Sequence, residues 1–183
     1  MAIQINGNGT ITGISAGGLP AGSVTSATLA AAARGKILQV VQATKTSEFS
    51  NTNTSYTDLT GLSASITPQT NSKILSIVEI QTYVEMDNNE GYGMQLVRTP
   101  SGGSGTNIYT SANKFEVYGY TDLTSDNIQK AMRSHWHILD SSVGGDGSTA
   151  ITYKVQVANY TSSQIRFSQD GNISTLTLME IAA

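Results

Sequence analysis

The feature that most constrains this chain is the alternation of apolar and polar residues along several stretches of its sequence. In the clearest case, Thr152, Lys154 and Gln156 separate four apolar residues: Ile151, Tyr153, Val155 and Val157. A period of two puts the apolar side chains on one face of a β-strand and the polar ones on the other. This pattern predicts a strand with one face in a core and one face toward solvent.

The same pattern recurs from Lys73 to Glu85, where Ile74, Val78, Ile80 and Val84 share one face. Apolar and β-branched stretches between turn residues predict further strands. These strands are expected at 37–43, 56–67, 92–98, 107–110, 115–120, 132–139, 164–168 and 173–181. No helical periodicity lies between them. We therefore predict an all-β, jelly-roll-like sandwich over residues 36–183.

Composition excludes several classes of function. Charged residues are only 13% of the chain, the net charge is −3, and Lys and Arg are scattered singly, so no basic patch predicts nucleic-acid binding. The absence of cysteine excludes disulfides and cysteine-bound metal, and no cofactor motif is present. No apolar run is long enough to predict membrane insertion, and the first residues lack the features of a secretory signal.

Residues 1–35 differ from the rest and predict an extended N-terminal arm followed by a short helix. Glycine-rich sequence surrounds a few apolar residues that cannot form a core alone and would need a partner chain. The candidate trimer or anchor residues are Ile3, Ile5, Ile11, Ile14, Leu19 and Leu29. The alanine-rich stretch 25–35 predicts the helix, with Ser26 as its N-cap and Gly35 at its end. A flexible leader is the alternative interpretation.

Three parts of the sequence resemble tail-fibre and related virion proteins of bacteriophages, especially those of cyanobacteria and marine bacteria. They are residues 5–14 with 18–20, residues 35–41 continuing through 56–62, 66–68 and 72–75, and residues 174–183. The resemblance implies a homotrimeric protein on the virion surface, made in the bacterial host cytoplasm. It also implies a head related to tumour-necrosis-factor and C1q domains, with an arm that contacts other virion proteins. The middle of the chain, about residues 85–130, lacks this resemblance.

The strongest indication of a binding surface is a group of tyrosines among Ser, Asn and Gly. The candidate receptor-binding residues are Tyr83, Tyr92, Tyr109, Tyr118 and Tyr120. Tyrosine gives contact area at low entropic cost, and its polar neighbours supply adaptable hydrogen bonds. The group therefore predicts contact with a host cell-surface glycan or protein. Ordinary half-buried strand tyrosines are the alternative.

Two other motifs suggest chemistry only weakly. His135 and His137 are two residues apart and so share a face of a strand, where copies around a trimer axis could bind a metal; no third ligand is evident within one chain. Gly13–Gly17 matches G-x-S-x-G but lacks the strand and helix that a serine nucleophile requires. We therefore predict a non-enzymatic tail appendage that helps the phage attach to its host. A capsid decoration protein and a glycan-degrading tailspike remain alternatives.

Overall fold

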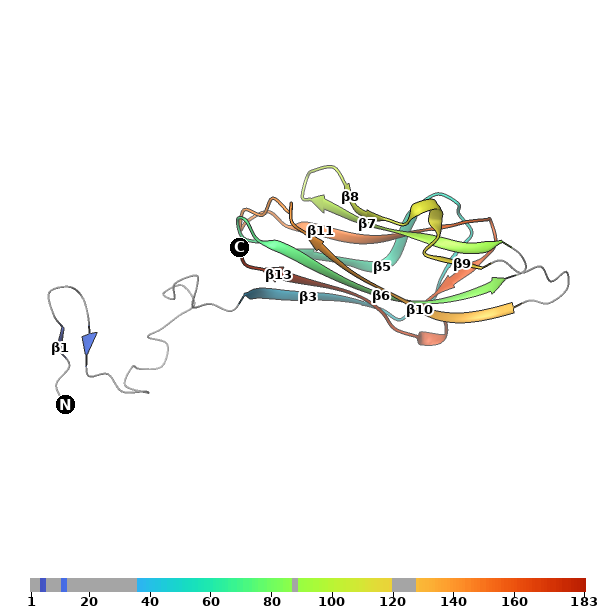
Figure 1. Ribbon diagram of the computed structural model, residues 1–183, viewed down its shortest axis with the longest axis horizontal. Coiled ribbons are helices and arrows are strands. Elements are labelled where there is room, and N and C mark those ends of the chain that lie inside the picture. The colour runs from blue at the N-terminus through green and yellow to red at the C-terminus, as the bar shows by residue number, and fades with distance from the viewer. Residues whose placement is uncertain (1–3, 6–10, 13–35, 87–88, 120–127) are drawn as a thin grey trace. The chain divides into compact units, whose positions relative to one another are not determined.

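The computed structural model describes residues 4–5, 11–12, 36–86, 89–119 and 128–183. The chain divides into two compact units, Met1–Lys36 and Ile37–Ala183, and we call the second unit the head (Figure 1). The strands of the head are β3 Ile37–Lys45, β4 Phe49–Asn51, β5 Thr57–Ile66, β6 Lys73–Met86, β7 Glu90–Pro100, β8 Thr106–Thr110, β9 Val117–Gly119, β10 Ile128–Asp140, β11 Ile151–Asn159, β12 Ile165–Phe167 and β13 Ser174–Ile181. The helical structure of the described residues consists of the 3-10 turns η2 Ala112–Lys114 and η3 Gln169–Gly171.

In the N-terminal unit the structure describes two short strands, β1 Gln4–Ile5 and β2 Ile11–Thr12. They pair antiparallel, with Ile5 opposite Ile11. Both strands lie within the segment that the sequence predicts as an extended N-terminal arm. The predicted helix at 25–35 lies outside the described residues.

The head is a sandwich of two antiparallel sheets, as the alternation predicts. One sheet has the order β3–β13–β6–β12–β4, with β10 paired to β6; the other has the order β5–β11–β7–β8, with β9 paired to β7. The long strand β6 pairs with β13 along its first half and with β12 near its end. This order joins strands that are distant in sequence, so the head closes through long-range pairing.

The core lies between the inner faces of the two sheets. Along β11 the alternate residues Ile151, Tyr153, Val155 and Val157 are at most 2% exposed, as the sequence predicts. Ile74, Val78, Ile80 and Val84 contribute the inner face of β6. Burial of these apolar side chains is the main stabilising contribution to the fold.

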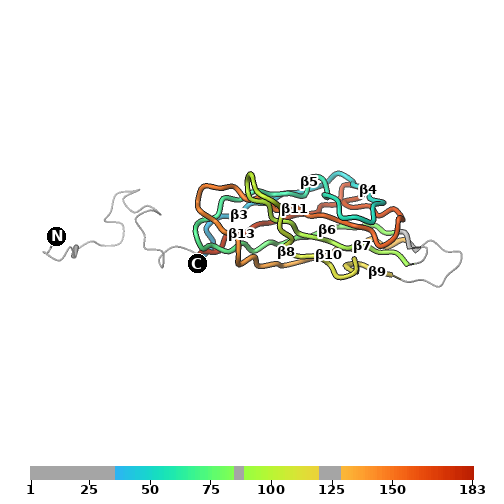
Figure 2. The backbone as a smooth tube through the Cα atoms, turned by 90° about the horizontal axis from the view of Figure 1, so that it is seen from above, coloured from blue at the N-terminus to red at the C-terminus, as the bar shows by residue number. Residues whose placement is uncertain are grey.

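The register of the strands defines two ends of the head. At the end we call proximal, Ile181 lies opposite Ile37, where the head begins. At the end we call distal, Asn159 lies opposite Tyr92 and Gly119 lies opposite Glu90. Figure 2 shows β9 at the end of the head that lies away from the C-terminus. The two ends differ in the kind of surface they carry.

Candidate binding surfaces

Three aromatic side chains gather at the distal end, and we call Phe115, Tyr118 and Tyr160 the aromatic cluster. Their ring centroids lie 4.7 to 5.2 Å apart. The rings are 47%, 41% and 38% exposed, respectively, although aromatic side chains usually bury most of their area. The Tyr118 hydroxyl donates to Asn89 Oδ1 at 2.9 Å. The cluster is therefore an exposed aromatic surface with an amide at its side.

The flap, residues 111–119, carries two of these rings and is held firmly to β7. Ser111 N donates to Met94 O at 2.8 Å, and Met94 N donates to Ser111 Oγ at 2.9 Å. Glu116 Oε2 accepts hydrogen bonds from Ser111 Oγ and Tyr109 Oη, both at 2.7 Å. Burial, together with the adjacent Glu116 carboxylate, raises the pKa of Tyr109. Hydrogen bonds made by the partly or fully buried residues Ser111 and Glu116 therefore hold the flap against β7.

Glycines in β7 allow this close approach. A Cβ at Gly91 would lie 2.1 Å from the Val117 carbonyl oxygen, and one at Gly93 would lie 2.5 Å from Lys114 Cα. In the flap itself, Asn113 and Lys114 have φ values of 52° and 60°. Such backbone conformations cost free energy in residues with a Cβ, so the surrounding contacts must hold this turn in place.

The third ring, Tyr160, is positioned by the buried residue before it. Asn159 Nδ2 donates to Asn51 O at 2.7 Å, and Asn51 Nδ2 donates to Asn159 Oδ1 at 3.0 Å. Tyr160 N donates to Gly91 O at 2.8 Å. Since β9 also pairs with Gly91, this one glycine brings both halves of the aromatic cluster together.

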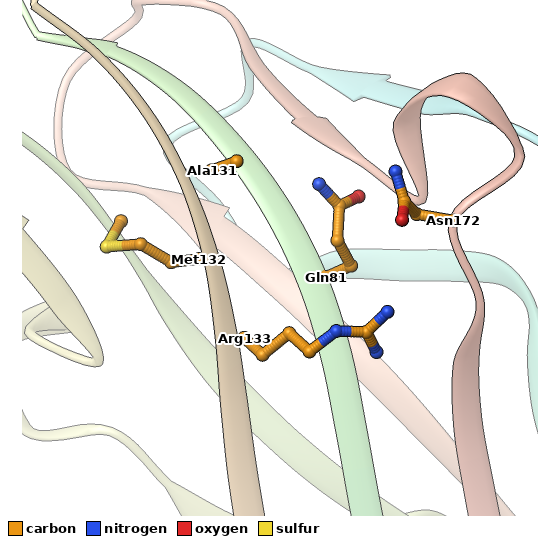
Figure 3. Close-up of a pocket in the computed structure, with 5 residues that line it drawn as sticks. All are labelled: Gln81, Ala131, Met132, Arg133 and Asn172. Carbon is orange, nitrogen blue, oxygen red and sulfur yellow. The ribbon is translucent and has the colours of Figure 1, made fainter.

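A second candidate is a polar hollow of about 210 Å³ on the outer face of the six-stranded sheet. Figure 3 shows the side chains of Gln81 and Arg133 extending toward the side of β6 on which Asn172 lies, while Met132 points away from them. These groups are already bonded within the protein: Gln81 Oε1 accepts from Gln169 N, and Arg133 donates to Glu79 and to Ile173 O. The contacts give this hollow a structural role.

A third surface lies near the proximal end of the same outer face. We call Val40, Leu75, Leu139 and Met179 the apolar row, because Val40 lies opposite Met179, Met179 opposite Leu75, and Leu75 opposite Leu139. Val40 is 55% and Leu139 49% exposed. The outer face of a sandwich is normally polar. A band of apolar residues across four strands is therefore a candidate surface for contact with another protein.

The predicted receptor-binding tyrosines do not form one site. Tyr92 lies in the core, 0% exposed, with its ring edge-on to Phe167 and its hydroxyl bonded to Ser134, so the structure removes it from the candidates. Tyr109 is half-buried against Trp136. Tyr83 lies beneath the guanidinium of Arg166 on the outer face. Tyr118 belongs to the aromatic cluster, and Tyr120 lies outside the described residues.

The structure describes both candidate metal-binding histidines but only two of the candidate anchor residues. His135 and His137 are exposed on the outer face of β10, opposite Glu79 and Ile77. No three His, Cys, Asp or Glu side chains within the described part of the chain are close enough to hold a metal ion. Ile5 and Ile11 pair across β1 and β2. The remaining anchor candidates, Ile3, Ile14, Leu19 and Leu29, and the G-x-S-x-G stretch lie outside the described residues.

Sequence reasoning missed Phe115 and Tyr160 as members of an exposed site. Tyr160 follows a strongly alternating strand and precedes a Ser/Thr-rich turn, which is a signal for an exposed loop position. The sequence predicts that Phe115 begins a strand, whereas the structure places it in the flap just before β9. Their proximity depends on pairing with β7, which no local pattern reveals.

Comparison with known proteins gives only remote similarity. No protein-family model matches the chain, and no curated protein matches it. Similar solved structures include infectious bursal disease virus Gx strain, with 16% identity and a TM-score of 0.47, covering 79% of this chain and 32% of that chain. Another is the VP2 subviral particle of the same virus, with 14% identity and a TM-score of 0.37, covering 79% and 38%.

The chain therefore spans about a third of the length of these viral chains. Identity this low says nothing of what the present chain binds or assembles with. Within the described residues, no helix has the length and apolar character needed to cross a membrane.

Proposed function

We propose that the chain is a structural protein of a bacteriophage virion, a homotrimeric tail appendage that contributes to host attachment without enzymatic activity. The apolar row is the observation that carries this proposal. Contiguous exposed apolar surface marks contacts between proteins, and the row crosses the whole width of the sheet from β3 to β10. Other copies of the chain are the partners that the resemblance to phage tail fibres implies.

The two ends of the head support a division of roles. Ile37, which directly follows the N-terminal unit, lies at the proximal end with the apolar row. The aromatic cluster lies at the distal end, where Tyr118 and Tyr160 both lie against Gly91 of β7. An appendage needs one end for assembly with other virion proteins and another end for host contact. This polarity favours an attachment protein over a capsid decoration protein, which would need only the assembly surface.

The location of the protein on the particle tests the proposal. A reconstruction of the virion, with antibody labelling of this chain, is expected to place trimeric density on the tail. Density distributed over the capsid would support the decoration alternative. Absence from the particle would contradict a virion role. Release of reducing ends from host polysaccharide by the purified chain would support the tailspike alternative.

A further inference from the structure

We infer that the aromatic cluster binds a saccharide, with a neutral sugar ring stacked on the exposed faces of Phe115, Tyr118 and Tyr160. This inference rests on the proposed attachment role and names the chemistry of the host surface that the head contacts. None of the tyrosines in the core or on the outer face of the six-stranded sheet is part of this surface.

The chemistry of the cluster matches a pyranose. A sugar ring has C–H bonds on its faces and hydroxyls around its rim, and the negative face of an aromatic ring attracts polarised C–H groups. The hydroxyls of Tyr118 and Tyr160 and the amide of Asn89 lie beside the rings and supply hydrogen bonds for the rim. The rings are tilted by 43° to 81° against one another, so a sugar stacked on one ring meets the edge of another.

The charges around the cluster favour a neutral ligand. None of the three rings carries a charge, and the carboxylate of the flap, Glu116, already accepts hydrogen bonds from Ser111 and Tyr109. Lys114, the cation of the flap, is half-buried. A basic peptide would find no free carboxylate among these flap residues.

The cluster is also held rigid, which lowers the entropic cost of binding. Its two halves come from the flap and from the end of β11. The flap is fixed through Ser111 and Glu116, and Tyr160 is fixed through the buried Asn159. Both halves lie against the same glycine, Gly91: Tyr118 is its partner across the β7–β9 pair, and Tyr160 N donates to its carbonyl oxygen. The relative positions of the rings are therefore set before a ligand arrives.

The exposed area of the aromatic cluster favours a saccharide over a protein partner. Three aromatic side chains of about 200 Å² each, a little over 40% exposed, present roughly 250 Å². A specific protein interface buries about 800 Å² on each partner. One or two sugar rings suit the smaller area. Weak binding at each site becomes effective when several copies on one particle act together.

Saturation-transfer NMR on the full chain tests the inference, with the methyl pyranosides of glucose, galactose, mannose and N-acetylglucosamine as probes. We expect at least one probe to bind with a millimolar Kd. Tyr160→Ala and Phe115→Ala should each weaken that binding by about tenfold, the change expected for losing one aromatic stacking partner. Tyr160→Phe should keep most of the affinity because it keeps the ring. Ile173→Ala, which alters an apolar side chain of similar exposure (49%), is the matched control.

The outcomes separate this inference from the proposed function. If no methyl pyranoside shows transfer, or if Tyr160→Ala and Phe115→Ala bind as the unchanged chain does, the saccharide site is refuted. The virion location and the trimer would be unaffected by that result. Retention of a host surface protein that is lost in Tyr160→Ala, without any saccharide signal, would likewise refute the saccharide and indicate a protein receptor.

Discussion

The buried carboxylate of Asp140 links the two sheets of the head near the proximal end. Asp140, on β10, is 5% exposed, and Arg98 Nη1 on β7 donates to its two oxygens at 2.9 and 2.8 Å. Tyr153 Oη on β11 donates to Oδ2 at 2.8 Å. These contacts give Asp140 a role in holding the two sheets of the sandwich together.

We expect Asp140→Ala to lower the free energy of unfolding by about 3–5 kcal/mol, because it leaves the partly buried Arg98 without its counter-charge. Urea denaturation at one fixed protein concentration measures the change. Asp58→Ala is the matched control, since the Lys154–Asp58 pair is solvent-exposed and should contribute under about 1 kcal/mol. Equal effects of the two variants would contradict a special role for the buried pair.

The buried phenol of Tyr92 should make the free energy of unfolding of the head decrease at alkaline pH. Burial raises the pKa of Tyr92 to about 12 from 10.0, so the folded protein keeps the phenol neutral where the unfolded chain ionises. The stabilising contribution is complete below pH 10 and is lost as the pH rises toward 12. A shift of two pKa units corresponds to about 2.7 kcal/mol.

Tyr92→Phe should therefore make the free energy of unfolding less dependent on pH above 10. The variant also loses the hydrogen bond to Ser134, which costs about 1 kcal/mol at every pH. The slope against pH is consequently the informative measurement, and urea titrations across this range supply it. Burial also raises the pKa of Tyr153. Part of the dependence of the unfolding free energy on pH should therefore remain in Tyr92→Phe. An unchanged slope in Tyr92→Phe would show that Tyr92 does not ionise on unfolding.

At the scale of elements, the flap depends on the absence of a side chain at Gly93. A Cβ there would lie 2.5 Å from Lys114 Cα and 2.7 Å from Tyr56 Oη. Gly93→Ala should displace the flap at a cost of about 1–3 kcal/mol while the two sheets stay paired. Hydrogen exchange is expected to increase at residues 111–119 and to stay slow in β6 and β11. Saccharide binding should weaken with it.

A control for this variant is Gly103→Ala in the turn between β7 and β8. The added Cβ would meet Pro100 at an acceptable 3.4 Å. Exchange in the flap should not change in this control. If Gly93→Ala leaves the flap as protected as in the unchanged chain, the close approach is not what positions Phe115 and Tyr118.

The strands were predictable from sequence to the extent that their pattern is local. Alternation identified β6 and β11, and the all-β sandwich followed from many such strands. The short strand β4 was missed, because Phe49–Asn51 is too brief to show a period. The β1–β2 pair and the aromatic cluster were missed for a different reason. Each depends on which strands become neighbours, and that choice is made by packing of the whole chain.

The burial of individual tyrosines shows the same limit. Tyr92 and Tyr118 are each followed by a glycine in the sequence, yet Tyr92 is in the core and Tyr118 is exposed. The direction of each side chain follows from strand register, and a shift of one residue exchanges the two faces. Register between β7 and β9 is set by tertiary contacts such as Gly91 against Val117.

At the scale of the whole molecule, the apolar row is the surface through which we expect one head to contact other copies of the chain. Its residues come from β3, β6, β10 and β13, so the row is a continuous surface and not scattered exposed side chains. Toward the distal end the same face turns polar, with Glu79 opposite both His135 and Thr175. Such a boundary is typical of a surface that is partly covered by neighbouring copies and partly exposed to solvent.

We expect Leu139→Glu to break the proposed homotrimer. Leu139 is 49% exposed in the single chain, so a glutamate there is tolerated by the folded head but places an unpaired charge in the contact between copies. Light scattering coupled to size exclusion should report a trimer for the unchanged chain and monomers for the variant, with equal circular dichroism spectra. Ile173→Glu is the control, because Ile173 has the same exposure but lies outside the row, and it should remain trimeric. A trimer that survives Leu139→Glu would place the contact elsewhere on the chain, since three buried carboxylates around one axis are not compatible with a tight apolar interface.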